Sequence, residues 1–490
     1  MNPPDFDLLI KNVRVVRPHG NVVHEADIAI KDGRFARVAP AIDPVRAKAV
    51  HDGRGLLAFP GVVDAHMHSG IYSPLAEDAV SESKAAAMGG VTSSLNYFRT
   101  GQYYLNKGGS YAKFFPEVLK TSKGRFHVDY GYHLAPMDRR HIAEIPMLIA
   151  RHGVASFKIF MFYGSHGLHG ASDSQREFLM IGEDERYDLA HFEFIMRGVQ
   201  AAREAMPDKA RQISLSLHCE TAEIMTAYTR LVEKDKSLKG LAAYSASRPQ
   251  HSEGLAVFIA SYLAHETALP NINLLHLSSR KAVQAALMMA EVFPHIDFRR
   301  EVTIGHLMLD VKAPAAELAK VNPPIRPRED VEFLWDALLA GELDWVVSDH
   351  ACCRHEMKIP KHYFGNIWMA KSGFGGTEYL LPALVSEGSR RGMGYNHMAR
   401  VTSWNPAQRF GLNHKGDIAE GFDADLALVD PAKTWTIRAA ESPSTQGYTP
   451  FEGLELSAAV RSTYLRGMKI CEDGQVIGKP RGQYLFRPTA

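Results

Sequence analysis

The chain has 490 residues, 46% hydrophobic and 23% charged, a composition typical of a folded globular protein that argues against a disordered one. Its 56 basic and 55 acidic residues give a formal net charge of +1, so no basic surplus favours nucleic acid or a membrane surface. Four cysteines are too few for a disulfide scaffold, and we find neither a targeting segment nor an apolar run of about 18 residues. We therefore expect a cytoplasmic protein with reduced thiols that binds neither nucleic acid nor membrane.

Both ends of the chain carry short β-rich segments. Near the N-terminus these are DLLIKNVRVV, EADIAIK and RFARVAP, and near the C-terminus they are ADLALVD, TWTIRA and STYLRGMKICEDGQVIG. The last segment is predicted to be a hairpin with Glu472, Asp473 and Gly474 as its turn. Because chain termini commonly lie close together, residues 1–59 and 410–490 are predicted to form one small β-sandwich domain, with a second domain, residues 60–409, inserted into it.

The middle of the chain alternates strand-like and helix-like segments. The strand-like runs lie at 62–66, 91–98, 127–133, 154–160, 213–218, 272–277, 298–304 and 344–349. The seventh run is rich in charge and is the weakest of the set. Successive β–α units of this number predict an α/β fold, a (β/α)8 TIM barrel.

Residue types that bind metals or move protons end most of these runs. His66 and His68 end the first and share one face, because alternate residues of a strand point the same way. His218 and His276 end the fifth and sixth runs, and Asp349 ends the eighth. An H-x-H pair alone is equally compatible with two ordinary buried histidines, but the whole set predicts a metal site at the carboxyl ends of the strands.

Lys158 interrupts the apolar fourth run, SFKIFMF. Burying a charged lysine there costs much free energy unless the amine is paired or neutralised. A strand interior also leaves little room for the side chain to reach solvent.

Taken in chain order, these segments resemble the amidohydrolase superfamily, and within it the cyclic-amide hydrolases dihydropyrimidinase and hydantoinase, with allantoinase and dihydroorotase as cousins. The resemblance covers nearly the whole chain. The matching segments are FPGVVDAHMH, AAAMGGVTSSLNY, GVASFKIFMFY, LSLHCE, LLHLSS, NPPIRPRED, VVSDHA, SGFGGTEYLLPAL, KGDIAEGFDADLALVD and YTPFEG.

The resemblance implies a centre of two divalent metal ions per subunit, usually Zn²⁺. The implied ligands are His66, His68, Lys158, His218, His276 and Asp349. The histidines of the first strand and the aspartate would hold one ion, and the histidines of the fifth and sixth strands would hold the other. A carbamylated Lys158 would bridge both ions.

The resemblance also implies the reaction, which is hydrolysis of a cyclic amide such as a dihydropyrimidine, a hydantoin or a related cyclic ureide or imide. A metal-bridging hydroxide would attack the ring carbonyl. Asp349 would carry the proton from the attacking water to the leaving nitrogen. Tyr163, five residues after Lys158, would donate a hydrogen bond to the oxyanion; the alternative is an aromatic residue that only lines the site.

Main-chain groups at Asn322 and at Ser372 and Gly373 are implied to bind the substrate ring. These positions are closer to dihydroorotase or allantoinase than to dihydropyrimidinase, whereas Tyr163 is typical of hydantoinases. An enzyme specific for allantoin or another heterocyclic lactam is therefore the alternative. Dihydroorotate is the least favoured substrate, because no arginine closely follows His68.

A non-catalytic scaffold protein of the same family is less favoured, because all implied metal positions are filled. The expected partners are a small cyclic amide and further copies of the chain, since relatives are commonly homotetramers.

Two loops, 99–115 and 164–170, are expected near the barrel mouth. Tyr103, Tyr104 and Tyr111 of the first could shape a pocket or pack as a surface loop. The roles of His166, His169, Cys352 and Cys353 stay open.

Overall fold

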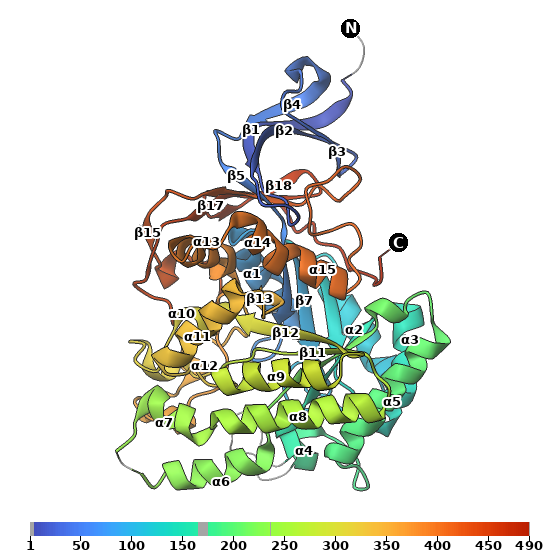
Figure 1. Cartoon of the computed structure of the whole chain (residues 1–490), viewed down its shortest axis with the longest axis vertical. Coiled ribbons are helices and arrows are strands. Elements are labelled where there is room, and N and C mark those ends of the chain that lie inside the picture. The colour runs from blue at the N-terminus through green and yellow to red at the C-terminus, as the bar shows by residue number, and fades with distance from the viewer. Residues whose placement is uncertain (1–3, 165–174, 236, 490) are drawn as a thin grey trace.

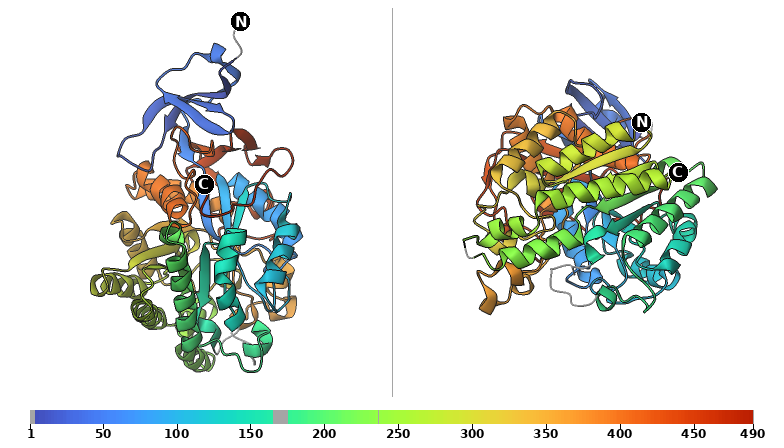
Figure 2. Two further views of the ribbon diagram at one scale, coloured as in Figure 1. Left: turned by 90° about the vertical axis from the view of Figure 1, so that its right-hand side faces the viewer. Right: turned by 60° about the horizontal axis from the view of Figure 1, so that its bottom comes forward.

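The computed structural model describes residues 4–164, 175–235 and 237–489. Figure 1 shows a barrel wrapped by helices and, at one end of it, a β-rich part to which both ends of the chain contribute. The left view of Figure 2 shows the same β-rich part projecting from the barrel.

The barrel is a sheet of eight parallel strands whose order in space follows their order in the chain. These strands are β6 (Val62–Met67), β7 (Val91–Phe98), β8 (Asp129–Leu134), β9 (Ser156–Phe160), β10 (Ser214–His218), β11 (Asn271–Leu274), β12 (Asp297–Thr303) and β13 (Trp345–Val347). A parallel bridge between Met67 and His350 brings the last strand back to the first, and the amide of His68 donates to the carbonyl of His350 at 2.8 Å. The predicted barrel and its eight strands are confirmed.

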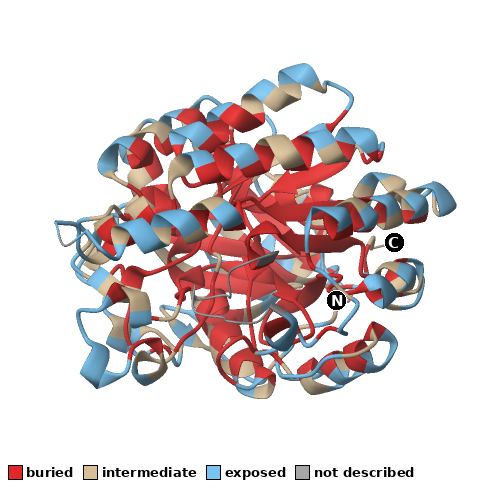
Figure 3. Cartoon of the chain, turned by 90° about the horizontal axis from the view of Figure 1, so that it is seen from below, coloured by how far each residue is buried: buried red, intermediate tan, exposed pale blue. Residues whose placement is uncertain are grey.

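Helices connect successive strands and cover the outside of the barrel. Their bounds are α1 (Leu75–Met88), α2 (Tyr111–Ser122), α3 (Arg139–His152), α4 (Gln175–Leu179), α5 (Leu189–Ala205), α6 (Ala222–Val232), α7 (Gly240–Ser247), α8 (Gln250–Glu266), α9 (Arg280–Val292), α10 (Ile304–Met308), α11 (Arg328–Leu339), α12 (His355–Lys358), α13 (Leu380–Arg390), α14 (Tyr395–Ala399) and α15 (Asn405–Arg409). Figure 3 shows buried strands at the centre and surrounding helices that bury one face and expose the other.

Local sequence sets where these helices begin and end. Asp138 caps α3 by accepting a hydrogen bond from the amide of His141, and Gly153 ends the helix with φ 64°, a left-handed conformation that favours glycine. Ser279 caps α9 in the same way through the amide of Ala282. Each cap fixes the point at which the chain leaves a strand end or returns to the next strand.

The charged run that was the weakest strand prediction is β12. Arg299 and Arg300 pair with Asp344 at 2.9 and 3.2 Å. Glu301 points inward and is fully buried. The charges therefore do not oppose the strand, because each has a partner.

The β-rich part is one mixed sheet of nine strands drawn from both ends of the chain. Its strands are β1 (Phe6–Val15), β2 (His24–Lys31), β3 (Arg34–Ala39), β4 (Ala47–Asp52), β5 (Leu57–Pro60), β14 (Leu426–Asp430), β17 (Ala459–Leu465), β18 (Met468–Glu472) and β19 (Gln475–Val476). The two ends meet where β14 pairs antiparallel with β5, Leu426 opposite Pro60. β5 leads straight into β6, so the sheet is joined directly to the barrel.

Two details of the C-terminal segments differ from the prediction. The segment predicted as one hairpin makes two turns, one at Arg466 and Gly467 and a second at Asp473 and Gly474, so β18 has a partner on each side. The segment TWTIRA contributes only β15 (Trp435–Thr436), which pairs with β16 (Glu455–Leu456) in a separate two-stranded sheet.

The last described residues close the amino end of the barrel. Gln483 and Leu485 exchange backbone hydrogen bonds with Tyr130 at 3.0 and 2.8 Å, and the amide of Arg487 donates to the carbonyl of Gly153 at 3.0 Å. Leu485 packs in an apolar cluster with barrel residues that include Leu95. We call residues 482–489 the C-terminal tail.

Within the described parts of the chain, no helix combines the length and the apolar character that crossing a membrane requires.

Candidate active site

A pocket opens at the carboxyl ends of the barrel strands, and it gathers nearly all the site residues predicted from the sequence. Those that line it are His68, Lys158, Tyr163, His218, His276, Asn322, Asp349, Ser372 and Gly373. The remaining predicted ligand, His66, lies just beneath this lining and contacts two of its members. Residues that are more than 300 positions apart in the chain, such as His68 and Gly373, are thus brought to one place by the closure of the barrel.

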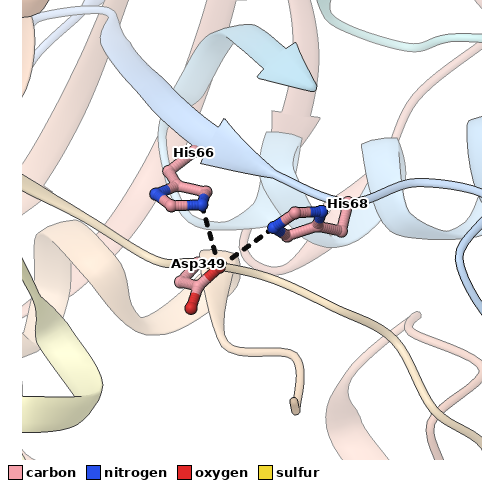
Figure 4. A group of neighbouring side chains, drawn as sticks. All are labelled: His66, His68 and Asp349. Carbon is pink, nitrogen blue, oxygen red and sulfur yellow. Dashed lines mark ion pairs between the residues drawn. The ribbon is translucent and has the colours of Figure 1, made fainter. Parts of the chain in front are cut away.

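His66, His68 and Asp349 form the tightest group in the site. Asp349 Oδ1 lies 3.2 Å from His66 Nε2 and 3.3 Å from His68 Nε2, and Figure 4 shows both rings directed at the carboxylate. All three residues are buried, and their potential ligand atoms lie within 4.8 Å of one another.

Each histidine of this group is oriented by a partner on its other ring nitrogen. His66 Nδ1 lies 2.7 Å from Glu301 Oε1, and His68 Nδ1 lies 2.7 Å from Tyr104 Oη. An Nδ1–H that donates to Glu301 leaves the Nε2 lone pair of His66 facing Asp349. This arrangement is the one by which a carboxylate fixes a metal-binding histidine.

Two of the predicted ligands have backbone conformations that are unusual for residues other than glycine. Asp349 has φ 54° and His276 has φ 35°. Such conformations cost energy and persist where the surroundings enforce them, as at many functional sites. Burial opposes ionisation of Asp349, but His66 and His68 outweigh it and hold the pKa of this carboxyl below its ordinary value.

Lys158 is buried at the centre of the site. Its Nζ lies 3.1 Å from His66 Nε2 and over the rings of Tyr97 and Phe160, at 4.1 and 4.4 Å from their centroids. Burial lowers the pKa of this amine to about 7. A substantial fraction of the side chain is therefore neutral near pH 7, despite the acidic groups nearby.

His218 and His276 lie side by side, with ring centroids 4.3 Å apart. His218 Nε2 contacts Glu220 at 2.6 Å, and Glu220 also pairs with Arg248. Burial would disfavour the charged Glu220, but Arg248 and His218 keep its pKa below the ordinary range. Among the described residues, His276 Nδ1 has no hydrogen-bond partner although it is buried.

These side chains fit a divalent cation. Burial lowers the pKa of His66 and of His276 well below the ordinary value, so both rings stay neutral, the form that binds metal. Nitrogen and carboxylate donors converge at His66, His68 and Asp349, and the ring of His276, whose buried Nδ1 has no hydrogen-bond partner among the described residues, lies with its centroid 5.4 Å from that of His66. The fit is closest for the first group, because its ligand atoms are already clustered.

Tyr163 lies in the 3₁₀ turn Met161–Gly164 that directly follows β9, which is why it reaches the pocket from the same strand as Lys158. Its ring stacks on Phe160 with centroids 4.6 Å apart. Arg99 Nε donates to its hydroxyl oxygen at 3.4 Å. The phenol is thus held at the wall of the pocket on one side by an aromatic ring and on another by a cation.

The two predicted substrate loops lie next to each other in the pocket. Tyr244 Oη donates to Asn322 Oδ1 at 2.5 Å, and the hydroxyl of Tyr72 donates to the carbonyl of Ser372. The amide of Gly373 donates to the carbonyl of Lys320 at 2.9 Å. A substrate ring would therefore share the Ser372 carbonyl with Tyr72, which a carbonyl oxygen with two lone pairs permits.

Sequence reasoning missed several residues of the site. Glu301 lies in the charged seventh run, and an acidic residue in a barrel strand could have indicated a partner for a site histidine. Glu220 follows His218 by two positions in LSLHCE, a spacing that places it within reach of the ring. Tyr72 and Arg99 come from loops after strands, and nothing in their local pattern distinguishes them. Tyr111, by contrast, is buried away from the pocket and donates to the carbonyl of Ala135 at 2.7 Å.

The other open positions are placed as follows. Cys352 and Cys353 are buried free thiols, and burial raises the pKa of both. His350, beside Asp349, is buried and contacts Glu82 at 2.8 Å. His166 and His169 lie outside the described residues.

The fold and the site together define a class of protein, a (β/α)8 barrel with histidine, lysine and aspartate side chains converging at the carboxyl ends of its strands. The sequence model of the amidohydrolase family matches residues 194–470. An allantoinase of Rubrobacter xylanophilus is 32% identical over 98% of this chain and 97% of its own. An allantoinase of Solibacter usitatus is 30% identical over 99% and 97%. The chain belongs to the amidohydrolase family.

Solved structures agree over the same extent. The L-hydantoinase (dihydropyrimidinase) from Arthrobacter aurescens has a TM-score of 0.84 and 26% identity, covering 98% of this chain and 99% of the other. The dihydropyrimidinase from Brevibacillus agri has a TM-score of 0.82 and 25% identity, covering 98% of both chains. The similarity thus includes the terminal sheet as well as the barrel.

Proposed function

We propose that this chain is a metal-dependent hydrolase that opens the ring of a cyclic amide. The observation that carries the proposal is the single pocket lined by candidate metal ligands, a lysine and a tyrosine at the carboxyl ends of the strands. Support comes from the allantoinases and hydantoinases that match the chain over nearly its whole length, since both kinds of enzyme act on cyclic ureides.

The side chains that would hold metal fall into two sets. His66, His68 and Asp349 would hold one divalent cation, and His218 and His276 a second, with Lys158 between the sets. Nitrogen and carboxylate donors of this kind suit zinc. When bound, such ions would lower the pKa of a water molecule and polarise the carbonyl to be attacked.

Lys158 is proposed to carry a carbamate. The neutral amine would add carbon dioxide to give an N-carboxylate and a proton, and the burial that lowers the pKa of Lys158 to about 7 supplies that neutral amine. The product is an anion placed between the two sets of ligands, where an ammonium group would repel cations.

The chain's own residues supply proton transfer and binding. The Asp349 carboxylate accepts a proton from the attacking water and delivers it to the leaving ring nitrogen. Tyr163 Oη donates a hydrogen bond to the carbonyl oxygen as negative charge develops on it. The Asn322 and Ser372 loops hold the ring in register with these groups, since both line the same pocket.

The walls of the pocket favour a ring with an apolar substituent. Ile71, Phe160, Phe162 and Val321 line it together with Tyr72 and Tyr104. Apolar and aromatic walls bind flat, weakly polar groups best. We therefore propose a hydantoin or dihydropyrimidine type of ring first and allantoin, with its polar side chain, second. The greater identity to allantoinases is the observation that favours the second.

A hydrolysis panel tests the proposal. Purified, zinc-loaded protein is incubated with dihydrouracil, hydantoin, 5-substituted hydantoins, allantoin, dihydroorotate and cyclic imides, and ring opening is measured. Turnover of 5-aryl or 5-alkyl hydantoins above allantoin would support the first choice, and the reverse order would support the second.

Metal content, measured on the same preparation, is the companion experiment. About two divalent ions per chain is the expected result. Absence of metal after metal-replete expression, together with no turnover of any panel compound, would contradict the proposal.

A further inference from the structure

Arg99 is a buried cation beside the pocket that the proposed reaction has not used. It directly follows β7, and only 1% of it is exposed. Its Nη1 donates to the carbonyls of Thr100 and Gln102 at 2.9 and 3.0 Å. Within the described parts of the chain it forms no ion pair with a carboxylate, and its Nη2 has no hydrogen-bond partner. A buried charge without a counter-ion is costly, so other interactions must offset it.

Aromatic rings surround the guanidinium group. Its Cζ lies 4.6 Å from the ring centroid of Phe178, 5.2 Å from that of Tyr163 and 5.6 Å from that of Tyr104. Cations over ring faces are attracted by the ring quadrupole, more so where water is excluded. Two of these rings, Tyr104 and Tyr163, line the pocket, whereas Arg99 stands behind them.

The contact with Tyr163 has a direction. Arg99 Nε donates to the hydroxyl oxygen at 3.4 Å, so this oxygen acts as the acceptor and the phenol proton points elsewhere. Burial raises the pKa of Tyr163, and the charge and hydrogen bond of Arg99 act in the opposite direction. A phenol beside a cation is a stronger hydrogen-bond donor than the same phenol in an apolar wall.

We propose that Arg99 is a positioning residue that acts through Tyr163, fixing the phenol and polarising it so that its proton meets the oxygen of the carbonyl under attack. The inference rests on the proposed function and adds a residue to it. It also explains why Arg99 has no carboxylate partner among the described residues, because an acid beside it would cancel the positive potential that the developing oxyanion needs.

A cycle of variants tests the coupling. R99M, Y163F and the double variant R99M/Y163F are compared with the starting protein, all metal-loaded, on the best substrate of the panel. We expect R99M to lower kcat about 10- to 100-fold with KM changed less than about 3-fold, because a group used only for the oxyanion affects kcat. In the Y163F background the same change should cost less than about 3-fold. R99K, which keeps the charge, should recover part of the loss.

Arg203 supplies the matched control. It too forms no ion pair among the described residues, and it donates to the carbonyls of Ala210 and Ile213 ahead of β10, at the opposite end of the barrel. R203M should keep kcat. If R99M does not fold, the cycle is run with R99Q, which removes the charge and keeps a polar side chain.

A spectroscopic readout is independent of activity. In protein labelled with 3-fluorotyrosine, the ¹⁹F resonance that is absent from the Y163F variant should shift in R99M and stay in place in R203M. Metal content should be equal in all variants.

The outcomes distinguish the inferred role of Arg99 from the proposed role of Tyr163. Equal losses from R99M in both backgrounds, or an unmoved resonance, would overturn the inference and leave the role of Tyr163 intact. An unchanged kcat in Y163F would overturn the role of Tyr163 in the proposed function, and the inference with it.

Discussion

The proposed function gives the Asp349 carboxylate two tasks. Its Oδ1 faces both His66 and His68, which is the position of a ligand, and the proposed reaction also requires it to move a proton. A carboxylate has enough lone pairs to do both, because one oxygen can face a cation while the other faces water.

Replacing Asp349 by Asn separates these demands. The amide keeps an oxygen for a cation but cannot accept a proton, so we expect kcat to fall by about 10³-fold or more while most of the metal stays bound. Steady-state kinetics and metal analysis of the same sample measure the two effects. Asp336→Asn, an exposed change on α11, is the control and should leave both unchanged. A D349N variant with nearly normal turnover would remove the proton-transfer role.

Lys158 can be tested by metal content alone. Lys158→Ala removes the proposed bridging anion, and we expect bound metal to fall from about two ions to one or fewer per chain. Lys358 offers a matched control, because burial also lowers its pKa to about 7, but its Nζ is bound by the carbonyls of Lys320 and Gly373. If Lys358→Met lost as much metal as Lys158→Ala, the loss would reflect general loosening of the site.

For individual residues, the sequence predicts membership of the candidate site better at strand ends than on loops. His66, His218 and Asp349 could be assigned because barrel geometry brings every strand end to one rim. Arg99 could not, since the conformation of its loop decides whether its side chain points inward or to solvent. The position of Tyr111 also depends on the conformation of its loop. The sequence allows it a place at the pocket, but it packs in the core.

Among the elements, β12 both forms ion pairs with a neighbouring segment and contacts a histidine of the candidate site. Arg299 and Arg300 pair with Asp344, and Glu301 accepts from Trp345 Nε1 at 2.9 Å and contacts His66. The contact of Glu301 with His66 Nδ1 therefore orients this histidine from another strand of the barrel.

Glu301→Gln tests that connection. The amide fills the same space but is a weaker acceptor for His66 Nδ1–H, so we expect zinc affinity to fall about 10- to 100-fold. Competition with a chelator of known affinity measures it. Glu291→Gln, on the exposed side of α9, is the control and should bind zinc as the starting protein does. Unchanged affinity in E301Q would show that packing alone orients His66.

Turns were harder to predict than strands. The segment 462–478 contains both an Arg-Gly and an Asp-Gly pair, and only the second is a strong turn signal by type. The structure turns at both, with Arg466 at φ 45° in a conformation that its residue type alone does not favour. Pairing with β14 on one side of β17 decides the outcome, and such long-range pairing is invisible to local patterns.

For the whole molecule, the prediction that both ends build one β-rich part is confirmed by the pairing of β5 with β14. The seating of the C-terminal tail was not predicted. Its sequence has no periodicity of strand or helix. It is held by backbone hydrogen bonds to Tyr130 and Gly153, which any residue can make, and by the buried side chain of Arg487, which donates to Ser156 Oγ at 2.9 Å.

Removing the C-terminal tail should destabilise the barrel. Deletion of residues 482–490 exposes the apolar cluster under Leu95 and leaves backbone groups of Tyr130 and Gly153 unpaired, so we expect the melting temperature to drop by roughly 5 °C or more. Differential scanning calorimetry measures the change, with the exposed substitution Lys479→Ala as the control. A truncated protein that melts with the intact one would show that the tail contributes no stability.

The place of the C-terminal tail also has a consequence for how the protein is made. Ribosomes build a chain from its N-terminus, and β8 and β9 are complete long before Leu485 and Arg487 emerge. Until these residues emerge, the apolar cluster around Leu95 lacks the side chain of Leu485. A segment made after all eight barrel strands thus completes an apolar cluster of the barrel, so the barrel reaches its final packing only after that segment has left the ribosome.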